Sequence, residues 1–108
     1  MAKLVILESA QRELEEIAVV HLNLVGSNSA RKITDRILDT LSRLEPFPLS
    51  GPEAWDRELK LQGYRYVIAG KYICLYRVIG DEVFVYHIAH GASNYPTLFK
   101  RMLREESE

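Results

Sequence analysis

Apolar residues recur with two different periods along the first 45 positions. Residues 3–7, Lys-Leu-Val-Ile-Leu, are rich in branched aliphatic side chains, which favours a short β-strand. Two later stripes have helical spacing: Leu14, Ile17, Ala18, His21 and Val25, and then Ala30, Ile33, Ile37, Leu41 and Leu44. We expect Ser9 to cap the first helix and Gly26 to end it. Pro46 stops the second helix, so the pattern predicts a strand followed by an antiparallel helical hairpin.

The second half of the chain changes to strand patterns. Residues 46–57 hold three of the four prolines and one glycine, which indicates a loop. Three segments rich in Val, Ile and Tyr follow at 64–69, 71–79 and 82–90, separated by tight turns at Gly70-Lys71 and Gly80-Asp81. Such strands form an antiparallel meander. Pro96 can start a last helix with an apolar side: Leu98, Phe99, Met102 and Leu103.

The predicted order of elements is therefore β-α-α-β-β-β-α. Because each helix of the hairpin has one apolar stripe, both need a surface to cover. We expect a two-layer α+β fold in which the N-terminal strand and the hairpin pack on a small twisted antiparallel sheet. A chain of 108 residues fits one domain, which we place at 1–104. The acidic residues 105–108 are expected to form a frayed tail.

Composition narrows the class of protein. No apolar run approaches the roughly 18 residues that a membrane span needs. The N-terminal run carries Glu8 and has no small-residue cleavage pattern, which argues against a signal peptide. A single cysteine, Cys74, cannot form an internal disulfide, so a reducing cytoplasm is the simplest expected compartment.

Charge is distributed unevenly although the net charge is only −1. Residues 57–104 carry eight Lys and Arg against three Asp and Glu, whereas residues 1–56 carry six against nine. The basic half is also rich in tyrosine, a combination that can hold phosphates and stack bases. A solubilising surface with tyrosines used for strand packing explains the same composition.

The stretch HIAHGASNYP, residues 87–96, raises the question of a metal or catalytic site. His87 and His90 are three apart, so on one strand they point to opposite faces and do not share a metal. The chain has no Cys-x-x-Cys, no His-Glu-x-x-His, no glycine-rich phosphate loop and no Gly-x-Ser-x-Gly. We therefore expect no metal and no cofactor.

Residues 63–95, GYRYVIAGKYICLYRVIGDEVFVYHIAHGASNY, resemble the RelE/ParE superfamily, toxins of bacterial type II toxin–antitoxin modules. The matching features are Arg65 early in the first meander strand, the Gly-Lys-Tyr-Ile-x-x-Tyr-Arg-Val strand, the Gly-Asp turn and a strand that ends in His90-Gly91. The front half, with its short strand and two helices, also fits. The ParE branch, known too as plasmid stabilisation proteins, is the most similar.

This resemblance implies a growth-inhibiting toxin that a cognate antitoxin neutralises, typically with a helix and an extended segment. Such a toxin meets operator DNA only through its antitoxin. Two activities occur in the superfamily: ParE-like members poison DNA gyrase and are not enzymes, whereas RelE-like members cleave mRNA in the ribosome. Whether this chain is an enzyme is thus left open by the resemblance alone.

Departures from the family pattern favour the ParE-like interpretation. Relatives commonly carry Arg-Asp shortly after His-Gly, where this chain has Ser93 and Asn94. In addition, the resemblance aligns Ile73 with the position of a RelE-like catalytic arginine. A nuclease that stabilises a phosphoryl transition state by charge would lack both cations. A RelE-like mRNA endonuclease stays as the alternative, and a degenerate, non-toxic antitoxin-binding module as a further one.

The resemblance and the residue types together give candidate sites. If the chain is a nuclease, Arg65, His90 and Tyr95 are its catalytic candidates. Target or nucleic-acid contacts are expected from the basic residues Lys60, Arg65, Lys71 and Arg77. Antitoxin contacts are expected from Leu98, Phe99, Met102 and Trp55. Each has a structural alternative: an ion pair for Arg65, a strand end for Arg77, a hydrogen bond to the turn for His90, and core packing for Trp55 and the apolar helix stripe.

Overall fold

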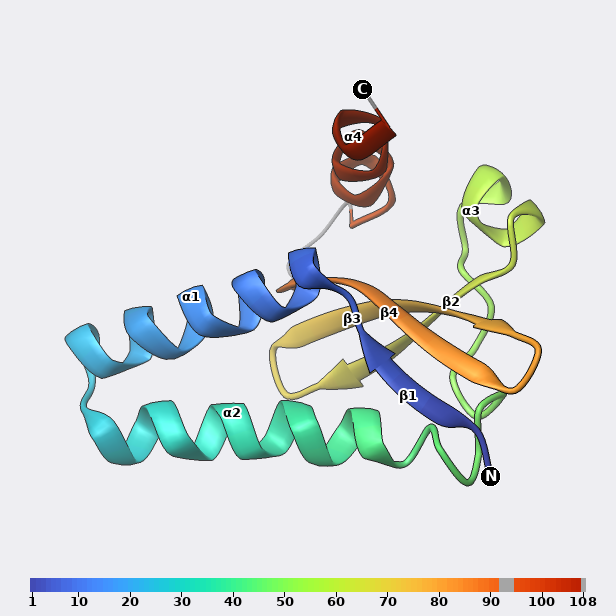
Figure 1. Ribbon diagram of the computed structural model, residues 1–108. Helices are drawn as coiled ribbons and strands as arrows, with labels where there is room; N and C mark the ends of the chain where they lie inside the picture. The colour runs from blue at the N-terminus through green and yellow to red at the C-terminus, as the bar shows by residue number, and fades with distance from the viewer. Residues whose placement is uncertain (92–94, 108) are drawn as a thin grey trace.

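The computed structural model describes residues 1–91 and 95–107, and it contains a four-stranded sheet with helices on both faces (Figure 1). The strands are β1 (Lys3–Ile6), β2 (Tyr64–Ala69), β3 (Tyr72–Ile79) and β4 (Glu82–His90), in the spatial order β1-β4-β3-β2. The last three form the predicted antiparallel meander. Strand β1 lies parallel to β4 at the sheet edge, in the register Lys3 with Glu82. The predicted α+β class is confirmed.

The helical hairpin consists of α1 (Glu8–Leu24) and α2 (Ser27–Ser42) and covers one face of the sheet (Figure 1). Its turn is short because Gly26 adopts a φ of 132°, a conformation that a side chain would disfavour. The main core lies beneath it and contains Ala10, Ile37, Leu41, Leu44, Ala69, Cys74, Tyr76, Val83, Val85 and Ile88. The expected Ser9 cap is wrong: Leu7 is the N-cap residue, and Ser9 donates a hydrogen bond to Glu106 instead.

The opposite face of the sheet carries a second, smaller core. It lies beneath α3 (Arg57–Leu61) and α4 (Tyr95–Ser107) and contains Ala54, Leu59, Tyr64, Tyr66, Ile73, Leu75, Tyr95 and Phe99. Sequence patterns did not predict α3, a five-residue helix whose N-cap, Asp56, accepts a hydrogen bond from the Leu59 amide. Helix α4 continues past residue 104 as far as Ser107.

A β-bulge in β4 shapes this second face. Leu75 pairs with His87 while Tyr76 pairs with Val85, so Tyr86 is an extra residue in the strand. Tyr86 packs against the smaller core, and the His87 ring stacks on Phe99 with centroids 6.1 Å apart. The bulge thus directs two consecutive side chains toward α4. No helix in the described ranges is long and apolar enough to cross a membrane.

Candidate functional site

Arg77 forms the centre of a basic and aromatic cluster on the α4 side of the sheet. Its guanidinium lies 4.8 Å from the Tyr64 ring centroid and 5.0 Å from that of Tyr86. It also donates to the Tyr86 hydroxyl, from Nη2 at 2.7 Å, and to the Gln62 carbonyl at 3.3 Å. Cation–π contacts and hydrogen bonds hold the side chain in one position. Arg77 can therefore present charge at this surface without a large loss of conformational freedom.

Tyr95 belongs to a separate aromatic cluster at the start of α4. Its hydroxyl accepts a hydrogen bond from the Trp55 backbone N–H at 3.1 Å, and its ring contacts Trp55, Tyr66 and Phe99. Burial raises the pKa of the Tyr95 hydroxyl above its ordinary value. A tyrosine that is 8% exposed and fixed in this way acts first as a packing residue. Trp55, by contrast, is 78% exposed and offers a large apolar surface to solvent.

Arg65 binds the loop that precedes α3. Its Nη1 donates to the carbonyls of Gly51, at 2.7 Å, and Leu49, at 3.3 Å. Its Nη2 lies 3.8 Å from Glu53, which also pairs with Lys60 at 3.4 Å. The guanidinium is thus largely committed to holding the loop against β2. An ion pair was the structural alternative that the sequence left open for Arg65. The structure shows such an ion pair, and it is made with the loop.

The other predicted residues lie apart from these clusters. Lys71 is in the β2–β3 turn, and His90, at the end of β4, contacts the Tyr72 ring on the hairpin side. Ile73, the position that the resemblance assigned to a RelE-like catalytic arginine, is buried in the smaller core. The structure therefore does not bring Arg65, His90 and Tyr95 together as a catalytic group. Ser93 and Asn94 lie outside the described residues.

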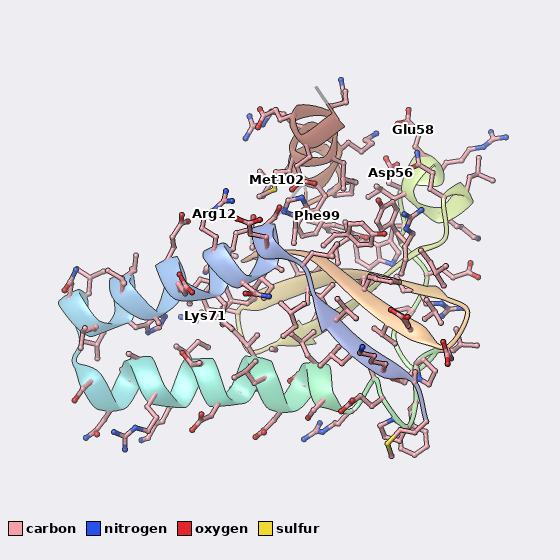
Figure 2. The ribbon with its side chains drawn as sticks, viewed as in Figure 1. Arg12, Asp56, Glu58, Lys71, Phe99 and Met102 are labelled. Carbon is pink, nitrogen blue, oxygen red and sulfur yellow. The ribbon has the colours of Figure 1, made fainter. Side chains whose placement is uncertain are left out.

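Helix α4 presents its apolar stripe to the sheet. Phe99 is fully buried in the smaller core, and Met102 packs against that core from the edge (Figure 2). Leu98 is half-buried. Lys100 anchors the helix to α3 through Asp56, with 2.8 Å between Nζ and Oδ2, and this contact lowers the pKa of Asp56. Of the predicted antitoxin contacts, Phe99 is core, whereas Leu98, Met102 and Trp55 retain accessible surface.

His87, to which the sequence pattern assigned no role, is a buried polar residue at the contact between the sheet and two helices. It is 2% exposed and lies between two carboxylates: Nδ1 is 3.1 Å from Glu13 Oε2, and Nε2 is 3.1 Å from Glu106 Oε1. Only the Glu13 contact is aligned as a hydrogen bond. Burial alone would lower the pKa of His87, but the two carboxylates outweigh it and raise the pKa.

Metal and thiol chemistry receive no support from the described residues. Within 1–91 and 95–107, no three His, Cys, Asp or Glu side chains are grouped to hold a metal ion. Cys74 is buried, and burial, followed by the nearby Glu13 charge, raises the pKa of its thiol to about 12. Such a thiol is almost entirely protonated at neutral pH and is a poor nucleophile.

Comparison with known proteins places the chain in a family. Residues 4–95 match the family described as the ParE toxin of the type II toxin–antitoxin system parDE. A structure of a chromosomal ParDE toxin–antitoxin system from P. aeruginosa is similar, with a TM-score of 0.71 and 21% identity over 83% of this chain and 96% of that one.

A second similar structure is the RelBE2 toxin–antitoxin complex from Mycobacterium tuberculosis, with a TM-score of 0.63 and 20% identity. It covers 82% of this chain and 96% of the other. At these identities the two structures establish the common fold. A comparison with curated proteins found no match to the sequence. Because the family match spans most of the chain, the protein belongs to the ParE toxins of type II toxin–antitoxin systems, within the RelE/ParE superfamily.

Proposed function

We propose that this toxin inhibits growth by poisoning DNA gyrase, and that a cognate antitoxin neutralises it. The observation that carries the proposal is that the residues a nuclease would need hold the fold together. Arg65 is bound to loop carbonyls, Tyr95 is buried, and Ile73 supplies no charge where a catalytic cation would act. Cleavage of RNA requires cations aimed at a developing phosphoryl charge. The arrangement favours a toxin that acts by binding a protein target.

For the target contact, the best-positioned group is Arg77 with its two tyrosines. A guanidinium that is already fixed over aromatic rings suits a protein interface, where arginine and tyrosine are frequent energetic centres. For the antitoxin, the accessible parts of Leu98, Met102 and Trp55 form the proposed contact. These residues lie on or beside α4, so one helical or extended segment of a partner can reach all of them.

The direct test is a gyrase assay with purified protein. We expect the wild-type toxin to inhibit supercoiling and to stabilise the cleaved gyrase–DNA complex, and the co-expressed antitoxin to reverse both effects. Replacement of Arg77 by glutamine should weaken inhibition, whereas Arg31→Gln, an exposed α2 residue outside the cluster, should not. Circular dichroism confirms that each variant is folded.

Expression of the toxin in bacterial cells tests the two alternative functions. Transcripts mapped at nucleotide resolution after induced expression should stay intact. Unchanged gyrase activity at high molar excess of toxin, together with new cuts in ribosome-bound mRNA, would replace this proposal with the endonuclease. A lack of any growth defect, in a host that responds to related toxins, would instead indicate a non-toxic antitoxin-binding module.

A further inference from the structure

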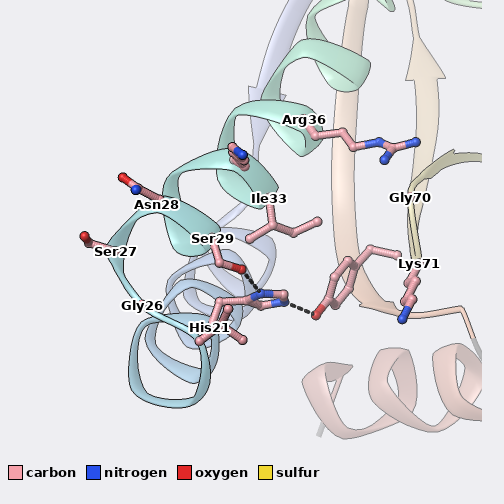
Figure 3. Close-up of a pocket in the computed structure, with 12 residues that line it drawn as sticks. His21, Gly26, Ser27, Asn28, Ser29, Ile33, Arg36, Gly70 and Lys71 are labelled. Carbon is pink, nitrogen blue, oxygen red and sulfur yellow. Dashed lines mark hydrogen bonds between the residues drawn. The ribbon is translucent and has the colours of Figure 1, made fainter.

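An open pocket of about 780 Å³ lies between the hairpin and the β2–β3 turn. Its walls come from the end of α1, the first turns of α2, and residues 70–72 (Figure 3). Of the catalytic, target-binding and antitoxin-binding candidates named from the sequence, only Lys71 lines it. The pocket is therefore distinct from the aromatic clusters beneath α4.

The charge of this pocket is entirely positive. Three basic side chains line it, Lys32, Arg36 and Lys71, and no Asp or Glu does. Within the described part of the chain, none of the three forms an ion pair or a side-chain hydrogen bond, whereas Lys60, Arg65 and Lys100 each meet a carboxylate. Cations that share a pocket without a counter-charge repel one another. A bound anion would remove that repulsion.

Backbone groups add to this positive potential. Helix α2 has 16 residues and begins without a side-chain hydrogen bond at its N-cap, Gly26. Residues 26–29 line the pocket, so the partially positive end of the helix lies at its wall. The His21 ring fixes the same wall, since its nitrogens lie 3.1 Å from the Ser29 and Tyr72 hydroxyl oxygens.

Arg36 is placed by a glycine in the facing turn. A Cβ on Gly70 would lie 3.4 Å from the Arg36 Cζ, so the bare backbone leaves room for the guanidinium. Gly70 also has a φ of 63°, which the tight turn requires. Figure 3 shows Arg36 extending from α2 toward this turn. The glycine thus lets the Arg36 guanidinium lie against the turn that carries Lys71.

We propose that this pocket binds the phosphate group of a nucleic-acid strand or of a free nucleotide. Lys32, Arg36 and Lys71 would neutralise the phosphate charge, and the first turn of α2 would donate backbone hydrogen bonds. Phosphate is favoured over a carboxylate because its tetrahedral oxygens can accept hydrogen bonds from several cations and from backbone N–H groups at a helix N-terminus at the same time. The inference does not depend on the proposed gyrase target, because it concerns a different surface.

The test is a titration of the full-length, isotope-labelled protein followed by NMR. The probes are inorganic pyrophosphate, a short DNA duplex of arbitrary sequence, and a hexaglutamate peptide. We expect pyrophosphate or the duplex to shift the amide signals of residues 26–29 and 71. In the double variant Arg36→Gln/Lys71→Gln, binding should weaken by about tenfold or more. Arg31→Gln, which removes one nearby exposed charge outside the pocket, should change binding by less than about twofold.

The two probes distinguish the sources of phosphate. A stronger response to the duplex, with a steep salt dependence, would identify a nucleic-acid backbone, and a stronger response to pyrophosphate would identify a small ligand. Three results would overturn the proposal: no shift at residues 26–29 with either phosphate probe, equal weakening by Arg31→Gln, or binding of hexaglutamate alone. The gyrase assay can fail while these shifts occur, so the two proposals are tested separately.

Discussion

Tyr76 is a single side chain that holds a whole loop in place. Its hydroxyl accepts the Gly51 backbone N–H at 3.0 Å and donates to the Pro48 carbonyl at 2.9 Å. Burial raises the pKa of Tyr76, so the hydroxyl stays protonated and available as a donor. Arg65 then binds the Gly51 carbonyl from β2. A loop rich in proline and without regular structure is thus tied to the sheet by two side chains.

This close approach makes Gly51 a sensitive position. A Cβ there would clash with the Tyr66 carbonyl oxygen and would lie 2.6 Å from the Tyr76 hydroxyl. We expect Gly51→Ala to lower the free energy of unfolding by about 1–3 kcal/mol, since the loop must shift and lose hydrogen bonds. Urea denaturation measures the change. The exposed neighbour Ser50→Ala serves as the control, and equal stability of both variants would contradict this account.

The roles of individual residues were the least predictable from sequence. Residue types identified Arg65 and Trp55 as noteworthy, and exposure of Trp55 agrees with a contact surface. The importance of His87 could not be read from its neighbours in the chain. Its partners are 74 and 19 positions away, and its direction depends on the bulge at Tyr86. Glu13 directly precedes Leu14 in the apolar stripe of α1, but that position alone does not indicate a histidine partner.

At the scale of elements, α4 is both a core helix and a proposed docking surface. Phe99 is buried against His87 and Tyr95, while Leu98 is half-buried one position earlier. Consecutive helical residues point about 100° apart, so one helix can pack with one side and bind with the next. The predicted antitoxin stripe therefore divides into a structural part and an accessible part.

Substitutions along α4 should separate these two parts. Phe99→Ala leaves a cavity in the smaller core, and we expect it to destabilise the protein by about 3–5 kcal/mol. Leu98→Ala should cost only about 1 kcal/mol, yet weaken antitoxin binding, while the exposed Arg101→Ala should change stability little. Thermal denaturation and calorimetric titration of co-purified antitoxin give the two quantities. Tight antitoxin binding by Leu98→Ala would exclude it from the interface.

Elements with a clear period were predictable, and those defined by contacts were not. The two hairpin helices and the three meander strands follow from periodicity and turn residues, which act within a few positions. Helix α3 has only five residues, too few to show a helical period. The parallel pairing of β1 with β4 joins segments almost 80 positions apart. Such pairing depends on the assembled sheet, so local pattern does not encode it.

At the scale of the whole molecule, His87 connects three elements that are distant in sequence. Glu13 reaches it from α1, and Glu106 reaches it from α4, while Ser9 donates a hydrogen bond to Glu106. Arg12, Glu16 and Glu105 line the same cavity and are the other charged groups nearby. The imidazole therefore joins the hairpin, the sheet and the last helix through its two carboxylate contacts.

This arrangement predicts a pH dependence of stability. The pKa of His87 is raised on folding, so its protonation stabilises the folded state fully below the ordinary value of 6.5. That stabilisation is lost as pH rises from 6.5 through the folded-state pKa. We expect the free energy of unfolding to fall over this window, and to fall less in Glu106→Gln, where one of the two carboxylates that raise the pKa is gone.

Urea denaturation at a series of pH values from about 6 to 9 measures the effect, because this range brackets an ordinary histidine pKa and values above it. The matched control is Glu105→Gln, which removes the same charge from the neighbouring position in the same cavity, whereas the ion pairs of His87 are with Glu13 and Glu106. Its profile should follow the wild type, while the Glu106→Gln profile should be flatter. Parallel profiles for all three proteins would show that the Glu106 contact does not raise the pKa of His87 and that packing contacts such as that of Phe99 and the Lys100–Asp56 pair hold α4 in place.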